Sequence, residues 1–181
     1  MRINNYIEGS CVNGPGFRFC IWAQGCERGC PGCFNKEACK MQGGQEMDIS
    51  EIFRIINRKK YDGISVSGGE PFYQKNDLEL LLKTAKEQKL NTLVFTGFLY
   101  EELLKDCSSI LRYCDYLIDG PYIRELPSHC KYAGSGNQRY LKLRDGLIES
   151  DLTFSTEDSS ECEIIINSDG IVTTTGFFDI L

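Results

Sequence analysis

Three cysteines lie within eight residues of one another, at Cys26, Cys30 and Cys33 in the stretch GCERGCPGCFN. Glycine or proline fills nearly every gap between them, so the stretch is predicted to be a tight irregular loop. It follows directly on residues 17–23, FRFCIWA, whose aromatic and β-favouring side chains predict a strand. The chain must therefore fold so that three thiols are presented together just beyond the end of a strand.

Four kinds of site compete for these thiols. A closed zinc site needs a fourth ligand, which His129 or a distant cysteine would supply, but the sequence has no second cysteine pair. A redox pair of Cys30 and Cys33 would leave Cys26 unused, and a chance cluster of core cysteines does not explain the glycine and proline spacers. An iron–sulfur cluster fits the spacing best, because thiolates are its usual ligands and three of them leave one iron open.

Strands and helices are predicted to alternate after this loop. Strands are expected at residues 64–67, 92–97, 116–120 and 139–143, and helices at 51–60, 77–89 and 101–114. This order is typical of an α/β fold built from right-handed β/α units around a parallel sheet. The strands are too few to close a full barrel, so we expect a partial, incomplete β/α barrel.

The tail of the chain differs in pattern. Residues 161–177 read as two strands around a Ser168-Asp169-Gly170 turn, which predicts a β-hairpin. We therefore expect a partial-barrel domain over residues 1–148 and a C-terminal hairpin extension over residues 149–181, for which the sequence indicates no role.

Each predicted strand ends in residues that are able to bind a ligand or take part in catalysis. The first leads into the cysteines, the second into SGGEP at residues 67–71, the third into Thr96 and the fourth into Asp119. The carboxyl ends of parallel strands lie at one edge of a sheet, where ligands bind. The sequence thus predicts a single site at that edge.

Composition limits the classes of partner and the cellular location that we expect for this chain. A net charge of −6 and a pI near 4.9 disfavour nucleic acid as a partner. The N-terminus lacks a signal-peptide pattern and no apolar run is long enough to span a bilayer, so we expect a cytoplasmic protein with no membrane association. Reduced thiols, a metal site or both are then expected. The seven cysteines outside the loop are interpreted as small buried hydrophobes, with a second metal site as the open alternative: Cys11, Cys20, Cys39, Cys107, Cys114, Cys130 and Cys162.

The motifs together resemble a known superfamily. C-x3-C-x2-C after a first strand resembles the cluster motif of the radical S-adenosylmethionine enzymes, and SGGEP resembles their GGE strand end. More specifically, the chain is similar to activating proteins of the anaerobic ribonucleoside-triphosphate reductase, which are glycyl radical enzyme activases. The matching segments run in order over about 130 residues: NGPGFRF, W-x-QGC-x3-CPGCFN, SGGEP, FTGF, YLIDGPYI and GSGNQRYLKL. The tail is longer than in the compact activases, and Gly32 stands where most superfamily members have an aromatic residue.

The resemblance implies a cofactor pair and a set of ligands. Cys26, Cys30 and Cys33 would bind three irons of a [4Fe–4S] cluster, and S-adenosylmethionine would chelate the fourth. The remaining implied contacts to S-adenosylmethionine are Gly68, Gly69 and Glu70 at its methionine end, Phe34 at its adenine, and Thr96 and Asp119 near its ribose, although a capping or turn role for the last two stays open. Asn137, Gln138 and Arg139 would line the site or dock the partner, or form a loop network; His129 is interpreted as a surface residue.

The resemblance also implies a reaction and partners. A flavodoxin- or ferredoxin-type donor would reduce the cluster, which would cleave S-adenosylmethionine to a 5′-deoxyadenosyl radical. That radical would take a hydrogen from a glycine in a glycyl radical protein, the large subunit of the anaerobic reductase. Two other classes stay open: a radical enzyme that modifies a peptide, a small molecule or another glycyl radical enzyme, and a metal-binding regulatory module without turnover.

Overall fold

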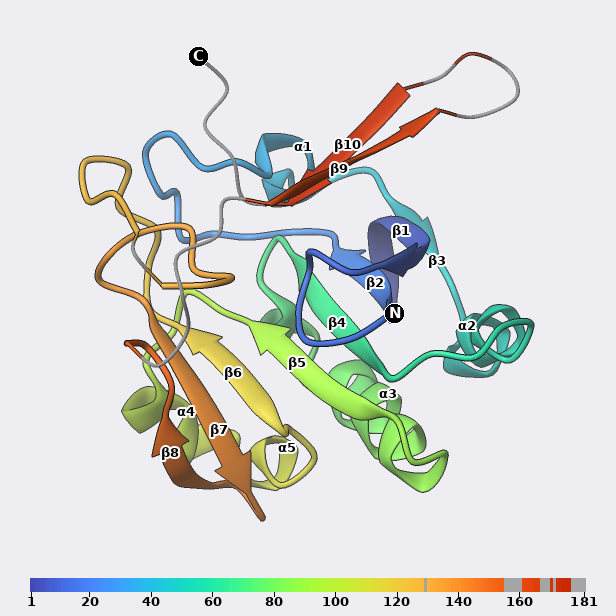
Figure 1. Cartoon of the computed structure of the whole chain (residues 1–181). Helices are drawn as coiled ribbons and strands as arrows, with labels where there is room; N and C mark the ends of the chain where they lie inside the picture. Colours follow the sequence, from blue (N-terminus) through green and yellow to red (C-terminus); the bar gives the residue numbers. More distant parts are fainter. Residues whose placement is uncertain (129, 155–160, 167–169, 171, 177–181) are drawn as a thin grey trace.

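The computed structural model describes residues 1–128, 130–154, 161–166, 170 and 172–176. An eight-stranded sheet has the order β3-β1-β2-β4-β5-β6-β7-β8 (Figure 1). Its strands are β1 (Arg2–Ser10), β2 (Arg18–Ala23), β3 (Gln45–Glu46), β4 (Gly63–Gly68), β5 (Asn91–Phe95), β6 (Tyr116–Asp119), β7 (Arg139–Arg144) and β8 (Leu147–Asp151). The mixed α/β class is confirmed.

The middle of the sheet is parallel. Strands β2, β4, β5 and β6 pair in parallel, in a register that sets Ala23 beside Gly68 at the carboxyl ends of β2 and β4. The flanking strands β1, β7 and β8 run antiparallel to their neighbours. The predicted fifth strand at residues 139–143 is thus present, but the chain reaches it through a loop without a crossover helix, and a strand connected in that way returns antiparallel.

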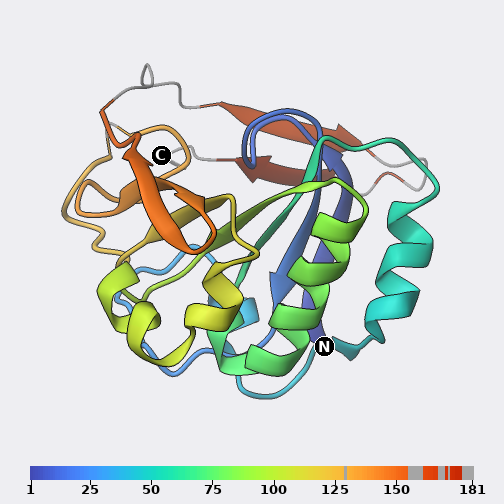
Figure 2. The same cartoon turned by 90° about the horizontal axis from the view of Figure 1, so that it is seen from below.

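Helices cover one face of the sheet (Figure 2). The longest is α3 (Lys75–Glu87), followed by α2 (Ile49–Ile56) and α4 (Tyr100–Asp106). The helices α1 (Lys36–Cys39) and α5 (Ser108–Leu111) and the 3-10 helix η1 (Pro71–Gln74) have four residues each. Alternate residues of the parallel strands, such as Ile21 and Val66, are buried with Leu81 and other helix residues in the larger apolar core. No helix in the described part of the chain is long and apolar enough to cross a membrane.

Strand β1 was missed by the sequence analysis. Its sequence, RINNYIEGS, carries two asparagines, a glutamate and a glycine, which are depleted in strands. Pairing with β2 decides its conformation, because Ile3 lies opposite Ala23 and Ile7 opposite Cys20 in an antiparallel ladder. Tertiary contact here overrides weak local propensity.

The tail forms a separate ribbon of two strands. β9 (Cys162–Ile166) and β10 (Val172–Gly176) pair antiparallel, and this ribbon lies on the face of the sheet opposite the helices (Figure 2). The predicted hairpin turn includes residues 168 and 169, which lie outside the described residues. The domain boundary at residue 148 stays a prediction.

Candidate active site

A cavity of about 120 Å³ lies at the carboxyl ends of β2, β4 and β5. It brings together most of the residues that the sequence singled out: Cys26, Cys30, Cys33, Phe34, Gly68, Gly69, Glu70 and Thr96. The convergence expected from the parallel register is therefore present. Asp119 is the exception among the predicted site residues, since only its neighbour Gly120 lines the cavity.

Backbone hydrogen bonds close the base of the cysteine loop, residues 25–35. The Gly25 N–H donates to Ala38 O at 2.7 Å and the Cys26 N–H donates to Cys39 O at 3.0 Å. The Gln24 side chain, 3% exposed, donates from Nε2 to Lys40 O at 2.5 Å. These bonds hold the two ends of the loop together, while the part that carries the cysteines projects with its thiols partly exposed.

A fourth cysteine lies beside the predicted three. Cys39, which the sequence analysis assigned to the core, lines the same cavity, and its Sγ lies 3.7 Å from the Cys33 Sγ. Burial, and then the neighbouring thiols of Cys33 and Cys26, raise the pKa of Cys39 to about 12. Its position at the end of α1 carries no sequence signal, because α1 itself is too short to be predicted.

The donor set fits a thiolate-held cluster. In the described residues, no group of three His, Cys, Asp or Glu side chains is placed to hold one metal ion. Thiolates that each bind a separate iron of a cluster do not have to meet at one point. All three thiols of the motif nevertheless line a single cavity, as a shared cluster requires.

Glu70 links two strand ends beneath the cavity. Its carboxylate is 1% exposed and accepts hydrogen bonds from the Gly97 N–H at 2.8 Å and the Thr96 hydroxyl at 2.9 Å. The Phe72 N–H donates to it as well, at 3.1 Å. Burial raises the pKa of Glu70, and these donors oppose the rise. Since a carboxylate offers about four acceptor positions, room for a further donor remains.

The two glycines before Glu70 allow the strand end to approach the cysteine loop. A Cβ on Gly69 would lie 2.4 Å from Gly25 O, and one on Gly68 would lie 2.4 Å from Ala23 N. The Glu70 N–H donates to Gly25 O at 2.9 Å, so the turn bonds directly to the base of the loop. Only glycine fits this approach.

Arg28 is a cavity residue that sequence reasoning missed. Its guanidinium lies over the Phe98 ring, with Cζ 4.6 Å from the ring centroid. The Arg28 Nε is buried and finds no hydrogen-bond partner among the described residues. The cavity thus combines a carboxylate, Glu70, with an unpaired cationic N–H, which is the complement of a zwitterionic amino-acid group.

Phe34 lines the cavity, whereas Asp119 lies behind it. The Phe34 ring is 58% exposed and packs against Tyr122 at a centroid distance of 4.8 Å. Asp119 is fully buried, accepts from the Tyr100 N–H at 2.7 Å at the start of α4, and forms an ion pair with Arg139. Its contacts are those of the structural alternative that the sequence left open.

The segment at residues 134–139 is a hydrogen-bonded loop network. Gln138 lines the cavity and accepts from the Gly134 N–H, while its Nε2 donates to Gly120 O, each at 2.8 Å. Asn137 donates to Pro121 O, and Arg139 pairs with Asp119 and Glu101. These contacts are those of the loop network that the sequence analysis left open for Asn137, Gln138 and Arg139, and Gln138 also lines the cavity. His129 lies outside the described residues.

The other scattered cysteines divide by environment. Four are buried, as expected for small core residues: Cys20, Cys107, Cys114 and Cys130. Cys11 and Cys162 are exposed, so the core interpretation was wrong for them. Cys11 follows β1 and Cys162 begins the ribbon strand β9, and neither position packs into a core.

Comparisons with known proteins agree with this geometry. Residues 12–141 match the family described as a 4Fe-4S single cluster domain. The anaerobic ribonucleoside-triphosphate reductase-activating protein of Enterobacteria phage T4 is 30% identical over 147 residues, which cover 77% of this chain and 93% of that protein. The protein of the same name from Escherichia coli K12 is 32% identical over 155 residues, covering 80% and 100%. The pyruvate formate-lyase-activating enzyme of Clostridium pasteurianum is 33% identical over 131 residues, covering 67% and 55%.

Proposed function

We propose a function from the premise that this chain belongs to the anaerobic ribonucleoside-triphosphate reductase-activating proteins, which are radical S-adenosylmethionine enzymes with a [4Fe–4S] cluster. In this proposal the chain activates an anaerobic ribonucleotide reductase by removing a hydrogen atom from a glycine of that partner. The observation that carries it is the shared cavity of the three motif cysteines and the turn from Gly68 to Glu70.

In this proposal, different residues around the cavity bind the cluster and S-adenosylmethionine. Cys26, Cys30 and Cys33 would hold the cluster, and three thiolates would leave it able to bind the amino-acid end of S-adenosylmethionine. Glu70 accepts from the ammonium group, and Arg28, whose Nε is buried without a partner, donates to the carboxylate. When bound and reduced, the cluster supplies the electron that splits S-adenosylmethionine into methionine and a 5′-deoxyadenosyl radical.

Other residues support this binding indirectly. Thr96 donates to Glu70 and keeps its carboxylate oriented, so we assign it a positioning role. Phe34 contributes its peptide and its exposed ring to the adenine end. Asp119 acts indirectly, because it accepts a hydrogen bond at the start of α4 and forms an ion pair with Arg139.

The partners follow from the same proposal. An incomplete β/α barrel would have an open side. The glycine loop of a large protein would reach the cavity through this side. The electron donor is a flavodoxin- or ferredoxin-type protein, and the reaction takes place in the cytoplasm.

Anaerobic reconstitution tests the proposal. We expect about four irons and four sulfides per chain, and 5′-deoxyadenosine on addition of S-adenosylmethionine and a strong reductant. Co-incubation with the anaerobic reductase encoded in the same genome should then produce a glycyl radical doublet in the electron paramagnetic resonance spectrum. Stoichiometric zinc without cleavage of S-adenosylmethionine would contradict the enzyme assignment.

A second candidate is the activation of another glycyl radical enzyme. It is favoured by the 33% identity to the pyruvate formate-lyase-activating enzyme of Clostridium pasteurianum, of which this chain covers 55%. A reductase that stays without a radical while a formate-lyase partner acquires one would select this candidate. Cleavage with neither protein activated would point to a peptide or small-molecule substrate.

A further inference from the structure

The thiols of Cys33 and Cys39 lie in hydrogen-bonding contact, with their Sγ atoms 3.7 Å apart. Cys33 belongs to the cysteine motif, and Cys39 lies outside it. In the free chain either sulfur can act as the donor. A cysteine that binds iron does so as a thiolate and has no proton to donate. Because two thiolates at this distance would repel each other, Cys39 would then keep its proton and be the donor.

Backbone hydrogen bonds hold Cys39 in this position. Its N–H donates to Asn35 O at 3.0 Å, and its carbonyl accepts from the Cys26 N–H, also at 3.0 Å. The preceding residue, Ala38, is buried and accepts from the Gly25 N–H at 2.7 Å. The Cys39 thiol is thus presented from a fixed backbone, as is expected of a group that orients and tunes a metal ligand.

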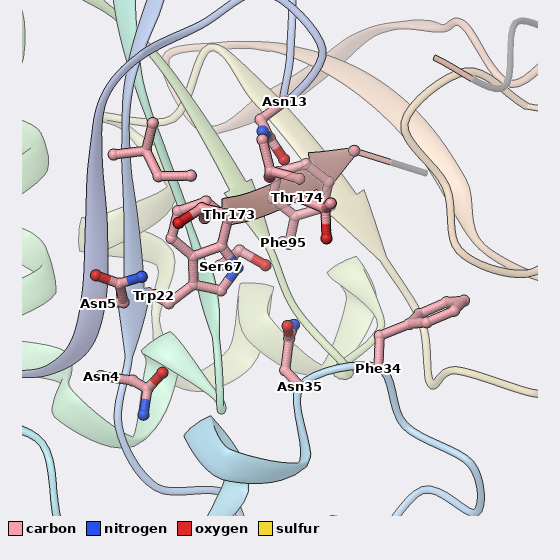
Figure 3. A pocket seen from close by; sticks show the side chains of 13 residues that line it. Asn4, Asn5, Asn13, Trp22, Phe34, Asn35, Ser67, Phe95, Thr173 and Thr174 are labelled. Carbon is pink, nitrogen blue, oxygen red and sulfur yellow. The ribbon is translucent and has the colours of Figure 1, made fainter. Parts of the chain in front are cut away.

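The side chains that follow Cys33 do not interrupt this contact. Phe34 and Asn35 line the cavity of the motif cysteines and also an adjoining cavity of about 320 Å³. In Figure 3, Asn35 points toward Ser67 and Thr173, whereas the Phe34 ring points to the other side. Neither side chain separates the two sulfurs, which remain in direct contact.

The donor at Cys33 differs in kind from the donor at Cys26. The Arg28 N–H, a backbone group, donates to Cys26 Sγ at 3.5 Å. Cys33 is bonded to a side chain instead, namely the thiol of Cys39. A hydrogen bond to a thiolate ligand stabilises the reduced cluster more than the oxidised one, because reduction adds negative charge. Such a donor therefore raises the reduction potential.

We propose that Cys39 is a positioning residue for the cluster, whose thiol donates an S–H···S hydrogen bond to the Cys33 thiolate and raises the reduction potential. The inference rests on the proposed function, because it requires that the motif binds a cluster. It adds a residue outside the motif to those that set how readily the cluster accepts an electron. Since the donor is a side chain, a substitution removes it without altering the backbone.

Reduction potentials test this role. Each reconstituted full-length variant is titrated anaerobically without S-adenosylmethionine, and electron paramagnetic resonance measures the reduced cluster. Cys39→Ala removes the donor and should lower the ratio of reduced to oxidised cluster about fivefold at a given potential, equivalent to about 40 mV for a one-electron couple. Cys39→Ser keeps a hydroxyl donor and should stay within about twofold of the unmodified chain. Cys11→Ala, which removes an exposed thiol, is the matched control and should leave the potential unchanged.

Infrared spectroscopy of the S–H stretching region identifies the donor directly. Cluster binding removes the protons of the motif thiols, so their S–H bands should disappear on reconstitution. Cys39 should keep a band, shifted to lower frequency by its hydrogen bond, and this band should be missing from Cys39→Ala. If Cys39→Ala does not take up iron, Cys39→Ser provides the same difference spectrum. Loss of the Cys39 band from the unmodified chain on reconstitution would make Cys39 a fourth thiolate ligand, which overturns the inference.

The outcomes separate this inference from the proposed function. Equal potentials in Cys39→Ala and Cys39→Ser, or equal shifts in Cys39→Ala and Cys11→Ala, overturn the role of Cys39 even if 5′-deoxyadenosine and the glycyl radical still form. A loaded chain that produces neither contradicts the proposed function instead, while the potentials still decide the role of Cys39. A higher potential after Cys39→Ala also overturns the inference.

Discussion

Two walls of the same cavity are built in opposite ways. The cysteine loop, residues 25–35, is bonded at its base but exposes Glu27, Gly29, Pro31 and Gly32 to solvent. The glycine turn, residues 68–70, is packed so closely against Ala23 and Gly25 that side chains larger than hydrogen do not fit at Gly68 or Gly69.

Under the proposed function, the difference reflects what each wall would bind, a cluster in the loop and an amino-acid group at the turn. A loop that encloses an inorganic cluster needs room for a bulky group, and partly exposed thiols remain accessible for its assembly. A turn that orients one organic group benefits from a fixed backbone, since rigid placement lowers the entropy lost on binding. Substitutions in the loop should therefore affect cofactor loading, and substitutions in the turn should affect folding.

The largest expected effect is on cluster loading. Cys30→Ala removes one of the three thiolates and should reduce bound iron to background after reconstitution, measured by iron and sulfide analysis. Cys107→Ala, at a buried cysteine of the apolar core, should retain the cluster. Cys39→Ala is the sharper control, because its sulfur lies 3.7 Å from Cys33 but outside the motif, and it should also retain iron. Equal loss in all three variants would refute this division of the cysteines.

Replacing glycine by alanine should lower the free energy of unfolding more in the glycine turn than in the cysteine loop. Gly69→Ala places a Cβ 2.4 Å from Gly25 O and 2.7 Å from Ala38 O. Because backbone atoms yield little, we expect a loss of about 3 kcal/mol in the free energy of unfolding. Gly29→Ala meets no atom within 4 Å and costs only the strain of φ 62°, about 1 kcal/mol. Urea unfolding of both variants measures the difference, and equal losses would contradict the contrast.

Glu70→Gln should have an intermediate effect. The amide keeps one acceptor oxygen, but its NH2 group cannot accept from the Gly97 N–H or the Thr96 hydroxyl, so one buried donor loses its partner. We expect a loss of about 2 kcal/mol in the free energy of unfolding. Thr96→Ser, which keeps the hydroxyl that donates to Glu70 and accepts from the Phe98 N–H, should cost less, and a larger loss for Thr96→Ser would argue against Glu70 as the centre of this network.

The smallest effect is expected away from both walls, at Glu101. Arg139 donates to its carboxylate at 2.8 and 3.0 Å, and these hydrogen bonds lower the pKa of Glu101. The folded state thus binds the Glu101 proton more weakly than the unfolded state does. The stabilisation is present above the usual carboxyl pKa and is lost as the pH falls through the lowered value.

Because Glu101 is exposed, its pair with Arg139 should contribute only about 0.5 kcal/mol. Glu101→Gln should reduce the unfolding free energy by this amount at neutral pH and leave it unchanged in acid. Unfolding curves at several pH values check this expectation. A constant difference at every pH would mean that the charge of Glu101 is not involved.

Several elements could be predicted because their signals are local. The strand ending at Ala23, the turn at Gly68 and the long amphipathic helix α3 each follow from composition and periodicity within a short window. Parallel pairing then required their carboxyl ends to meet, and they do. Strand β1, α1 and the position of Cys39 lacked such signals, since each depends on contacts made across the fold.

Arg18 illustrates what a local pattern does not reveal. It stands in the predicted strand motif FRF, yet its guanidinium is fully buried and donates to Ser65 Oγ at 2.7 Å and to Ile64 O at 2.5 Å. An arginine in an aromatic strand would be expected to reach solvent. The acceptors that allow its burial come from β4 and β5, far along the chain.

The sequence by itself determined the chemistry: three thiols at a strand end, a glycine turn with a carboxylate, and the order in which they occur. The tertiary structure decided which residues join them. It brought Arg28 and Cys39 to the cavity and set the ribbon beside it. The physical reason is that ligand type and spacing are properties of short segments, whereas proximity between distant segments depends on packing of the whole sheet and its register.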